Sequence, residues 1–298
     1  MRWKRGVGGN QIDDRRGMGG GGMGGGGFPM GRAGGGLGGL GLVIVLLTLF
    51  LGGGLPGGGN GGGGIDIGPS LQPFPGAPAA EGRPLESRGQ VDDFVAFVVH
   101  DVQRTWTRLF QQAGRQYRPT KLVLFEQAVS SGCGNASSAT GPFYCPVDSK
   151  VYLDLSFFRE LRQRFGAPGD FAQAYVIAHE FGHHVQNVLG IADEVRREQQ
   201  GNRDDANELS IRMELQADCL AGVWAHSAYK EQLLESGDLE EGLAAAAAVG
   251  DDRIQEQATG RVERESWTHG SSEQRTSWFR KGFDGGDVAA CDSFSGSV

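Results

Sequence analysis

Three histidines and a glutamate fall within six consecutive positions, in the segment HEFGHH at residues 179–184. His179 and His183 are four residues apart, so on a helix both imidazoles leave the same face. Two nitrogens at that spacing can bind one zinc ion at about 2 Å. Glu180 can take a proton from a water molecule at the metal and pass it to a leaving amine. The segment therefore predicts two zinc ligands and a general base within one helical turn.

A catalytic zinc site needs a third protein ligand. One known arrangement places a glycine and a second histidine further along the helix, but Gln186 and Leu189 stand at those positions. Glu214, in the stretch RMELQADCLAGVWAH, lies 31 residues after His183 and can return on an antiparallel helix. Asp218 follows on the same face and can accept the second N–H of a ligand histidine. The sequence thus predicts a zinc site formed by the two histidines and Glu214.

The remaining histidines have no comparable context. His184 points about 100° away from His183 on a helix, which favours a packing role. His226 lies about 120° off the face of Glu214, and His100 belongs to a separate amphipathic segment. None of these three is expected to bind the metal.

The elements that must position the site follow from apolar spacing and turn residues. Strands come first and helices second, which predicts an α+β fold with a small, largely antiparallel sheet. Residues 151–154 are expected to be an edge strand that holds an extended substrate by β-augmentation. We expect strands at 122–129, 142–147 and 151–154, and helices at 91–114, 156–166, 170–190, 206–230, 238–249 and 272–283.

The residues before the folded domain fall into three segments of different composition. Residues 1–36 are basic and glycine-rich, and residues 56–90 form a Gly/Pro-rich stretch typical of a linker. Between them the run at 37–55 carries no charge, and its 19 residues would span about 28 Å as a helix. From residue 91 to residue 298 the composition is that of a folded domain with a sizeable core.

The uncharged run predicts a single-pass membrane anchor with a cytoplasmic amino terminus, because basic residues precede it and none directly follows. The domain at 91–298 would then lie in the periplasm or outside the cell. Two alternatives stay open: the short apolar centre, Leu40–Leu51, also suits a cleaved signal peptide or a buried core helix.

Four cysteines follow the run: Cys133, Cys145, Cys219 and Cys291. Disulfides are permitted in the expected compartment. Cys133 and Cys145 flank a Gly/Ser loop that a disulfide would close, and the other two would then pair. Three connectivities are possible, and free structural thiols remain an alternative. No CxxC pair exists, which excludes a zinc ribbon.

Several stretches resemble the neutral zinc metallopeptidase family of bacteria: CGNASSATGPFYCPVDSKVYLDLSFF, AHEFGHHVQ, ELQADCLAG and THGSSEQR. The resemblance implies a zincin-like fold, with His179, His183 and Glu214 as zinc ligands and Glu180 as the catalytic residue. The last stretch is also similar to the H-P-x4-R segment of integral-membrane HExxH peptidases, with Gly270 in place of the proline. By that likeness His269 would donate to the oxyanion and Arg275 would help to position it.

The expected activity is hydrolysis of a peptide or protein substrate by a membrane-anchored zinc enzyme. Three rivals share parts of the pattern: a zinc-dependent binding or chaperone-like module without turnover, a zinc amidase acting on cell-wall crosslinks, and an inactive metal-stabilised domain. An intact Glu180 argues against the first, since binding needs no base. The net charge of −8 argues against a general nucleic-acid partner.

Overall fold

The computed structural model describes residues 1–17, 87–163, 166–167 and 169–298. The expected membrane anchor at 37–55 lies outside these residues, as does most of the expected linker. Within the described ranges, no helix has the length and apolar character needed to cross a membrane.

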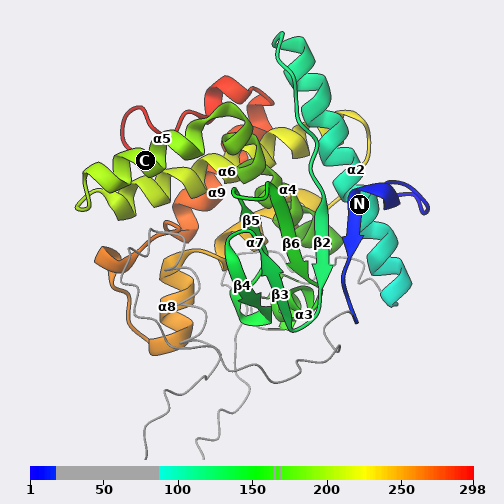
Figure 1. Cartoon of the computed structure of the whole chain (residues 1–298), viewed down its shortest axis with the longest axis horizontal. Helices are drawn as coiled ribbons and strands as arrows, with labels where there is room; N and C mark the ends of the chain where they lie inside the picture. Colours follow the sequence, from blue (N-terminus) through cyan, green and yellow to red (C-terminus); the bar gives the residue numbers. More distant parts are fainter. Residues whose placement is uncertain (18–86, 164–165, 168) are drawn as a thin grey trace, which may run out of the picture.

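A four-stranded sheet forms one layer of the molecule (Figure 1). β1 and β2 are parallel, β2 and β6 are parallel, and β6 and β5 are antiparallel. A separate antiparallel hairpin of β3 and β4 packs beside it. The strand bounds are β1 Ile12–Asp14, β2 Leu122–Phe125, β3 Ala128–Ser131, β4 Gly134–Ser137, β5 Phe143–Cys145 and β6 Lys150–Asp154.

The α+β class is confirmed, but two expectations about the sheet were wrong. Two of its three strand pairings are parallel rather than antiparallel. β6 lies between β2 and β5, so it is not an edge strand and cannot accept a substrate strand. The edge positions in the described sheet belong to β1 and β5. The strand expected at 122–129 is also divided, since β2 ends at Phe125 and β3 begins at Ala128, with Gln127 at a φ of +67° between them. Local sequence pattern carries no information on which strand lies next to which.

The strands are apolar on both faces because two cores flank the sheet. Leu122 and Leu124 face the main core with the helices, whereas Val123 and Phe125 face a smaller cluster with Val129. Side chains alternate between the faces of a strand, so a strand buried on both faces reads as a continuous apolar run.

Eight α-helices lie within the described residues. Their bounds are α2 Arg88–Gln112, α3 Ser156–Gln163, α4 Asp170–Leu189, α5 Ile191–Gly201, α6 Ala206–Lys230, α7 Asp238–Ala248, α8 Asp251–Thr259 and α9 Ser272–Gly285. Short 3₁₀ turns occupy Gly9–Gln11, Ser138–Thr140, Arg264–Ser266 and Val288–Cys291. The sequence did not predict α5 and α8, and each buries a single side chain, Val195 or Asp251. Helices with so little buried surface give no apolar periodicity to detect.

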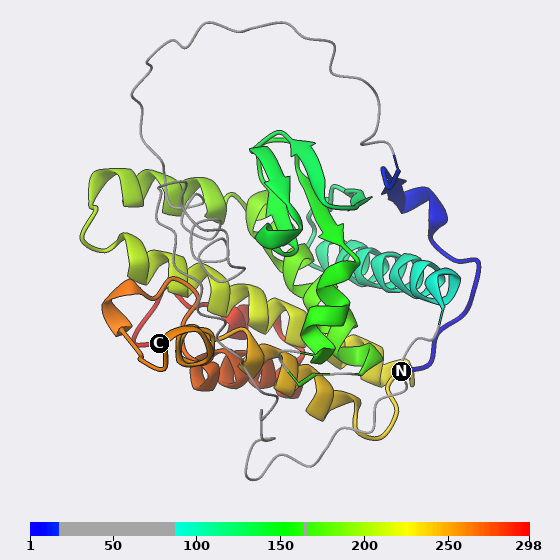
Figure 2. The ribbon, with the colours of Figure 1, turned by 90° about the horizontal axis from the view of Figure 1, so that it is seen from below.

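α4, which carries HEFGHH, is the central element. It packs against the sheet strands β5 and β6 on one side and against α6 and α7 on the other (Figure 2). Its residues from Asp170 to Gly182 are all buried. This two-sided burial explains why the sequence around the histidines is apolar all round rather than amphipathic.

The first seventeen residues pack onto the domain and do not form a separate tail as expected. β1 pairs in register with β2, Ile12 opposite Leu122, and the turn at Gly9–Gln11 contacts α2. The blue segment beside α2 shows this placement (Figures 1 and 2). The folded unit therefore contains residues 1–17 as well as the residues from Ser87 onward.

All four cysteines are paired, Cys133 with Cys145 and Cys219 with Cys291. The second disulfide joins α6 to the carboxyl-terminal turn, and both of its cysteines are buried. The two disulfides confirm the expected pairing of the cysteines and select one of the three possible connectivities.

The two disulfides should differ in their contribution to stability, since they close loops of 12 and 72 residues. By loop-closure entropy, replacing both cysteines with alanine should cost about 3 kcal/mol for Cys133–Cys145 and about 4 kcal/mol for Cys219–Cys291. Urea unfolding of the two double variants measures this. A smaller loss for the 72-residue loop would contradict the prediction.

Candidate metal centre

The close approach of α4 and α6 builds the site. Gly182 lies at their crossing, and a Cβ atom there would lie 2.9 Å from the carbonyl oxygen and 3.0 Å from the Cα of Ala217. Any larger residue would push the helices apart. The glycine inside HEFGHH therefore lets α6 bring Glu214 and Asp218, on either side of Ala217 in sequence, up to the histidines of α4.

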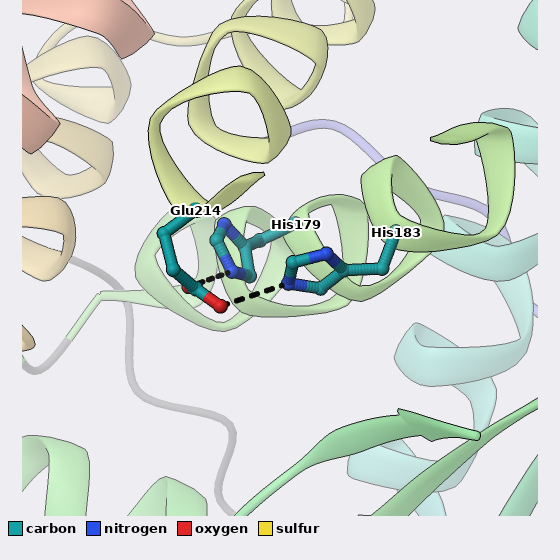
Figure 3. Close-up of side chains that lie close together, drawn as sticks. All are labelled: His179, His183 and Glu214. Atoms are coloured by element: carbon teal, nitrogen blue, oxygen red, sulfur yellow. Dashed lines mark hydrogen bonds and ion pairs between the residues drawn. The ribbon is translucent and has the colours of Figure 1, made fainter. Parts of the chain in front are cut away.

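Glu214 reaches across from α6 and faces both histidines (Figure 3). Its Oε2 lies 3.2 Å from Nε2 of His179, and its Oε1 lies 3.4 Å from Nε2 of His183. The potential ligand atoms of these three residues all lie within 4.8 Å of one another. The structure thus brings together the three residues that the sequence predicted as ligands.

The spacing fits a zinc ion. Two atoms that each lie 2.0–2.1 Å from one zinc at a tetrahedral angle are about 3.3 Å apart. The two nitrogen-to-oxygen separations, 3.2 Å to Oε2 and 3.4 Å to Oε1 of Glu214, are close to this value. Two imidazoles and one carboxylate are also the ligand set of catalytic zinc sites, which leave a fourth position open. His179, His183 and Glu214 therefore fit zinc in both chemistry and distance.

The other ring nitrogen of each histidine is held by a neighbour. Nδ1 of His179 lies 2.8 Å from Oδ1 of Asp218, and Nδ1 of His183 lies 2.8 Å from Oε1 of Gln186. Because each partner oxygen accepts, each Nδ1 carries a hydrogen, and Nε2 is the nitrogen of each ring that a metal would use. The carboxamide of Gln186 is fixed in turn by the carbonyl of Met213.

The charges of the site favour a cation at its centre. Burial opposes ionisation of Glu214, but His183 and His179 outweigh it and hold its pKa well below the usual range. Burial also opposes protonation of His179, but Asp218 and Glu214 outweigh it and raise the pKa of this imidazole to about 10. The carboxylates thus hold a proton where a metal ion would bind, and metal binding would displace it.

Asp218 and Arg275 form a buried ion pair behind His179. The guanidinium of Arg275 donates from Nε to Oδ2 at 2.7 Å and from Nη2 to Oδ1 at 3.0 Å. Tyr175 donates its hydroxyl to the same Oδ1, and Nη1 of Arg275 donates to the carbonyl of Val249. Asp218 is fully buried and Arg275 is 3% exposed. This bidentate geometry directs Arg275 toward Asp218, and the expected part of Arg275 in positioning the oxyanion stays a prediction.

Glu180 lies beside the histidines and is 8% exposed. It borders a small recess between α4 and the sheet, lined by Leu122, Pro142, Val151, Leu153, Val176 and Ile177. Burial raises the pKa of Glu180. A carboxylate with a raised pKa accepts a proton more readily, which suits a general base.

His269 comes from the loop before α9 and is oriented by Asp251, the first residue of α8. Asp251 accepts hydrogen bonds from Nδ1 of His269 at 2.9 Å and from its backbone N–H at 2.6 Å. It also accepts from the backbone of Thr268 and Gly270. Burial disfavours the charged ring, but Asp251 and the charge of Glu214 outweigh it and raise the pKa of His269. Because Nδ1–H donates to Asp251, Nε2 carries a hydrogen only when the ring is protonated, the form that the raised pKa favours.

Gly270 explains the departure from the H-P-x4-R pattern. Its φ of +83° lies in the left-handed region, whereas proline is fixed near −65°. This loop therefore cannot carry a proline at that position, and the His269-to-Arg275 spacing is kept without it.

Asp251 should act on activity only through His269. Replacing Asp251 with asparagine removes the charge that holds the ring, and we expect kcat to fall about tenfold with KM little changed. In a His269→Ala background the same replacement should change kcat no further. Steady-state kinetics on the two single variants and the double variant measure this coupling. Additive losses would show that Asp251 only stabilises the loop.

The other histidines lie outside the centre, as expected. His184 donates from Nε2 to the carbonyl of Arg118 at 2.7 Å, and its Nδ1 lies 3.1 Å from the hydroxyl of Tyr144. Burial lowers its pKa, so this ring is neutral and joins α4 to the segment before the sheet. His226 bonds the carbonyl of Phe283.

Sequence reasoning missed three supporting residues. Tyr175 and Gln186 could have been found, because they lie four residues before His179 and three residues after His183, each on the same helix face as that histidine. Asp251 gave no signal, since it begins a helix that the sequence did not predict and lies 18 residues from His269.

Comparisons with known proteins identify the family of the chain. Uncharacterized protein YpfJ of Escherichia coli K12 is 45% identical over 306 aligned residues, which cover the whole of both chains. Uncharacterized protein Rv2575 of Mycobacterium tuberculosis is 51% identical over 191 residues, covering 60% of this chain and 64% of the relative. No solved structure matches the chain. Residues 1–294 match the profile described as "Putative neutral zinc metallopeptidase", and the chain belongs to that family.

Proposed function

We propose that the protein is a zinc metallopeptidase that hydrolyses peptide bonds, with His179, His183 and Glu214 as zinc ligands. The observation that carries the proposal is the convergence of three ligand side chains, with Nε2 of His179 and Nε2 of His183 at 3.2 Å and 3.4 Å from the two carboxylate oxygens of Glu214 and with Glu180 beside them. Membership of the metallopeptidase family supports the same activity.

A zinc ion held by these residues supplies Lewis acidity toward a water molecule and a peptide carbonyl. Glu180 takes the proton of the attacking water and passes it to the leaving amine nitrogen. In its protonated form, with Nδ1–H held by Asp251, His269 donates from Nε2–H to the oxyanion that develops on the carbonyl oxygen. Asp218 fixes the tautomer of His179, and Arg275 holds Asp218 in place without contacting the substrate.

The proposed place of action is outside the cytoplasm. Two disulfides support it, since such bonds persist in oxidising compartments. Attachment to a membrane is proposed through the uncharged run at residues 37–55.

Cleavage of a mixed peptide library by the full chain, with products identified by mass spectrometry, tests the activity. New peptide termini should form, and they should be absent from a Glu180→Gln sample prepared in parallel. Equal product formation by both samples would assign the cleavage to a contaminant and contradict the proposal.

A further inference from the structure

The amino group of the chain lies in a pocket of carboxylates at the beginnings of α4 and α7. The α-ammonium of Met1 donates to Oδ1 of Asp170 at 2.6 Å and to Oδ1 of Asp238 at 3.3 Å. Glu235 lies 3.6 Å away, and Glu241 completes the cluster with Asp170 and Asp238. The side chains of Asp170, Asp238 and Glu241 are only 3–4% exposed. Buried carboxylates need a counter-charge, and the ammonium supplies it.

The pocket joins the beginnings of two helices. Asp170 is the first residue of α4, the helix that carries His179 nine residues later, and Asp238 is the first residue of α7. Glu241 accepts the backbone N–H of Phe171 at 2.9 Å. Burial, with the charges of the two aspartates, raises the pKa of Glu241 to about 7. Without the ammonium, the cluster would repel itself at the start of the zinc-binding helix.

The residues that follow Met1 are held along their length. The backbone N–H of Arg2 donates to the carbonyl of Leu233 at 2.6 Å, and the ring of Trp3 packs edge-on against Phe94. Strand β1 then pairs with β2. These backbone hydrogen bonds and the ring contact do not involve the ammonium. They too place the first seventeen residues against the domain.

The basic residues of this segment pair with carboxylates of the domain. Arg16 is bound by Asp92 at 2.7 Å, Arg5 lies 3.8 Å from Asp93, and Arg2 lies 3.7 Å from Glu235. On sequence alone, these cations were expected to be a cytoplasmic topology signal. In the structure they complement an acidic surface at the start of α2 and before α7.

We propose that residues 1–17 are an intramolecular docking segment, with the α-ammonium of Met1 as the ligand of the Asp170/Asp238/Glu241 pocket. Docking requires the amino terminus and the peptidase domain to occupy the same compartment. One net membrane crossing between residues 17 and 87 would separate them. This proposal therefore replaces the expected topology, in which the amino terminus is cytoplasmic and the domain is external. The uncharged run at residues 37–55 would then attach the chain to a membrane without a net crossing.

Acylation of the full chain with an amine-reactive ester near neutral pH tests whether the ammonium is buried. Met1 should react at least about tenfold more slowly in the native chain than in urea. The exposed ε-amine of Lys4 serves as the internal control, because it should react in both states. Equal rates at the Met1 amine in both states would overturn the proposal.

A short Gly-Ser extension placed before Met1 should displace the ammonium and lower the thermal midpoint by roughly 5 °C. The same extension after Val298 should leave the midpoint unchanged. In the amino-terminally extended chain, Asp238→Asn should restore part of the loss, because it removes a carboxylate that has lost its counter-charge. An extension without effect would overturn the role of the ammonium.

Impermeant maleimide labelling of full chains in intact spheroplasts tests the shared compartment. Lys4→Cys reports on the segment, and Val147→Cys, at a side chain 72% exposed, reports on the domain. The four native cysteines are in disulfides and do not compete. Both sites should be labelled together or protected together. Labelling of one site alone would place them on opposite sides of the membrane and overturn the proposal.

Discussion

Replacing Glu180 with glutamine should lower kcat for peptide hydrolysis about 1,000-fold, a loss of about 4 kcal/mol in transition-state stabilisation. The amide is nearly the same size as the carboxylate but cannot accept the proton of the attacking water. Because Glu180 is not one of the three proposed ligands, bound zinc should remain at the wild-type level. Steady-state kinetics together with elemental analysis measure both quantities on the same sample.

The matched control is Glu194→Gln, which changes an exposed glutamate on the following helix and should leave kcat unchanged. Loss of zinc from Glu180→Gln would mean that Glu180 holds the metal rather than the proton. Retention of full activity would remove it from the mechanism.

Replacing Asp218 with asparagine should destabilise the protein by about 3–5 kcal/mol and weaken zinc binding about 10–100-fold. The change leaves the guanidinium of Arg275 buried without its counter-charge and deprives His179 of its anionic acceptor. Urea unfolding measures the first effect, and competition with a zinc chelator measures the second.

Two further variants distinguish the effect of breaking the buried Asp218–Arg275 pair from the effect of losing any carboxylate charge. The double variant Asp218→Asn/Arg275→Met removes both charges and should regain most of the stability but not the zinc affinity. Asp193→Asn breaks the exposed pair with Arg196 and should cost less than about 1 kcal/mol. A stable Asp218→Asn protein with unaltered zinc affinity would contradict the proposed support of His179.

The sequence predicted the site better than the fold because the ligand spacings are local. His179 and His183 are about one helical turn apart, as are Glu214 and Asp218, so helix geometry alone places each pair on one face, and Glu180 directly follows His179. Joining the two groups needed one further inference, that α6 returns antiparallel to α4. Gly182, at the crossing of α4 and α6, lets the two helices approach closely enough for Glu214 to reach the histidines.

Strand order and the packing of the first seventeen residues could not be predicted in this way. β1 is three residues long and pairs with a strand 110 positions later, Ile12 opposite Leu122. Its neighbours are charged, and a glycine tract follows it, so local pattern indicated a solvated tail. The basic residues were informative, but their partners are carboxylates distant in sequence, such as Asp92 for Arg16.

The central claim is that His179, His183 and Glu214 together hold one zinc ion. Elemental analysis of the full chain tests it most directly, with Glu214→Gln as the variant and Glu208→Gln, an exposed glutamate on the same helix, as the control. We predict about one zinc per chain in the wild type and in Glu208→Gln, and a loss of most of it in Glu214→Gln. Zinc retained in Glu214→Gln, or absent from the wild type, would contradict the account.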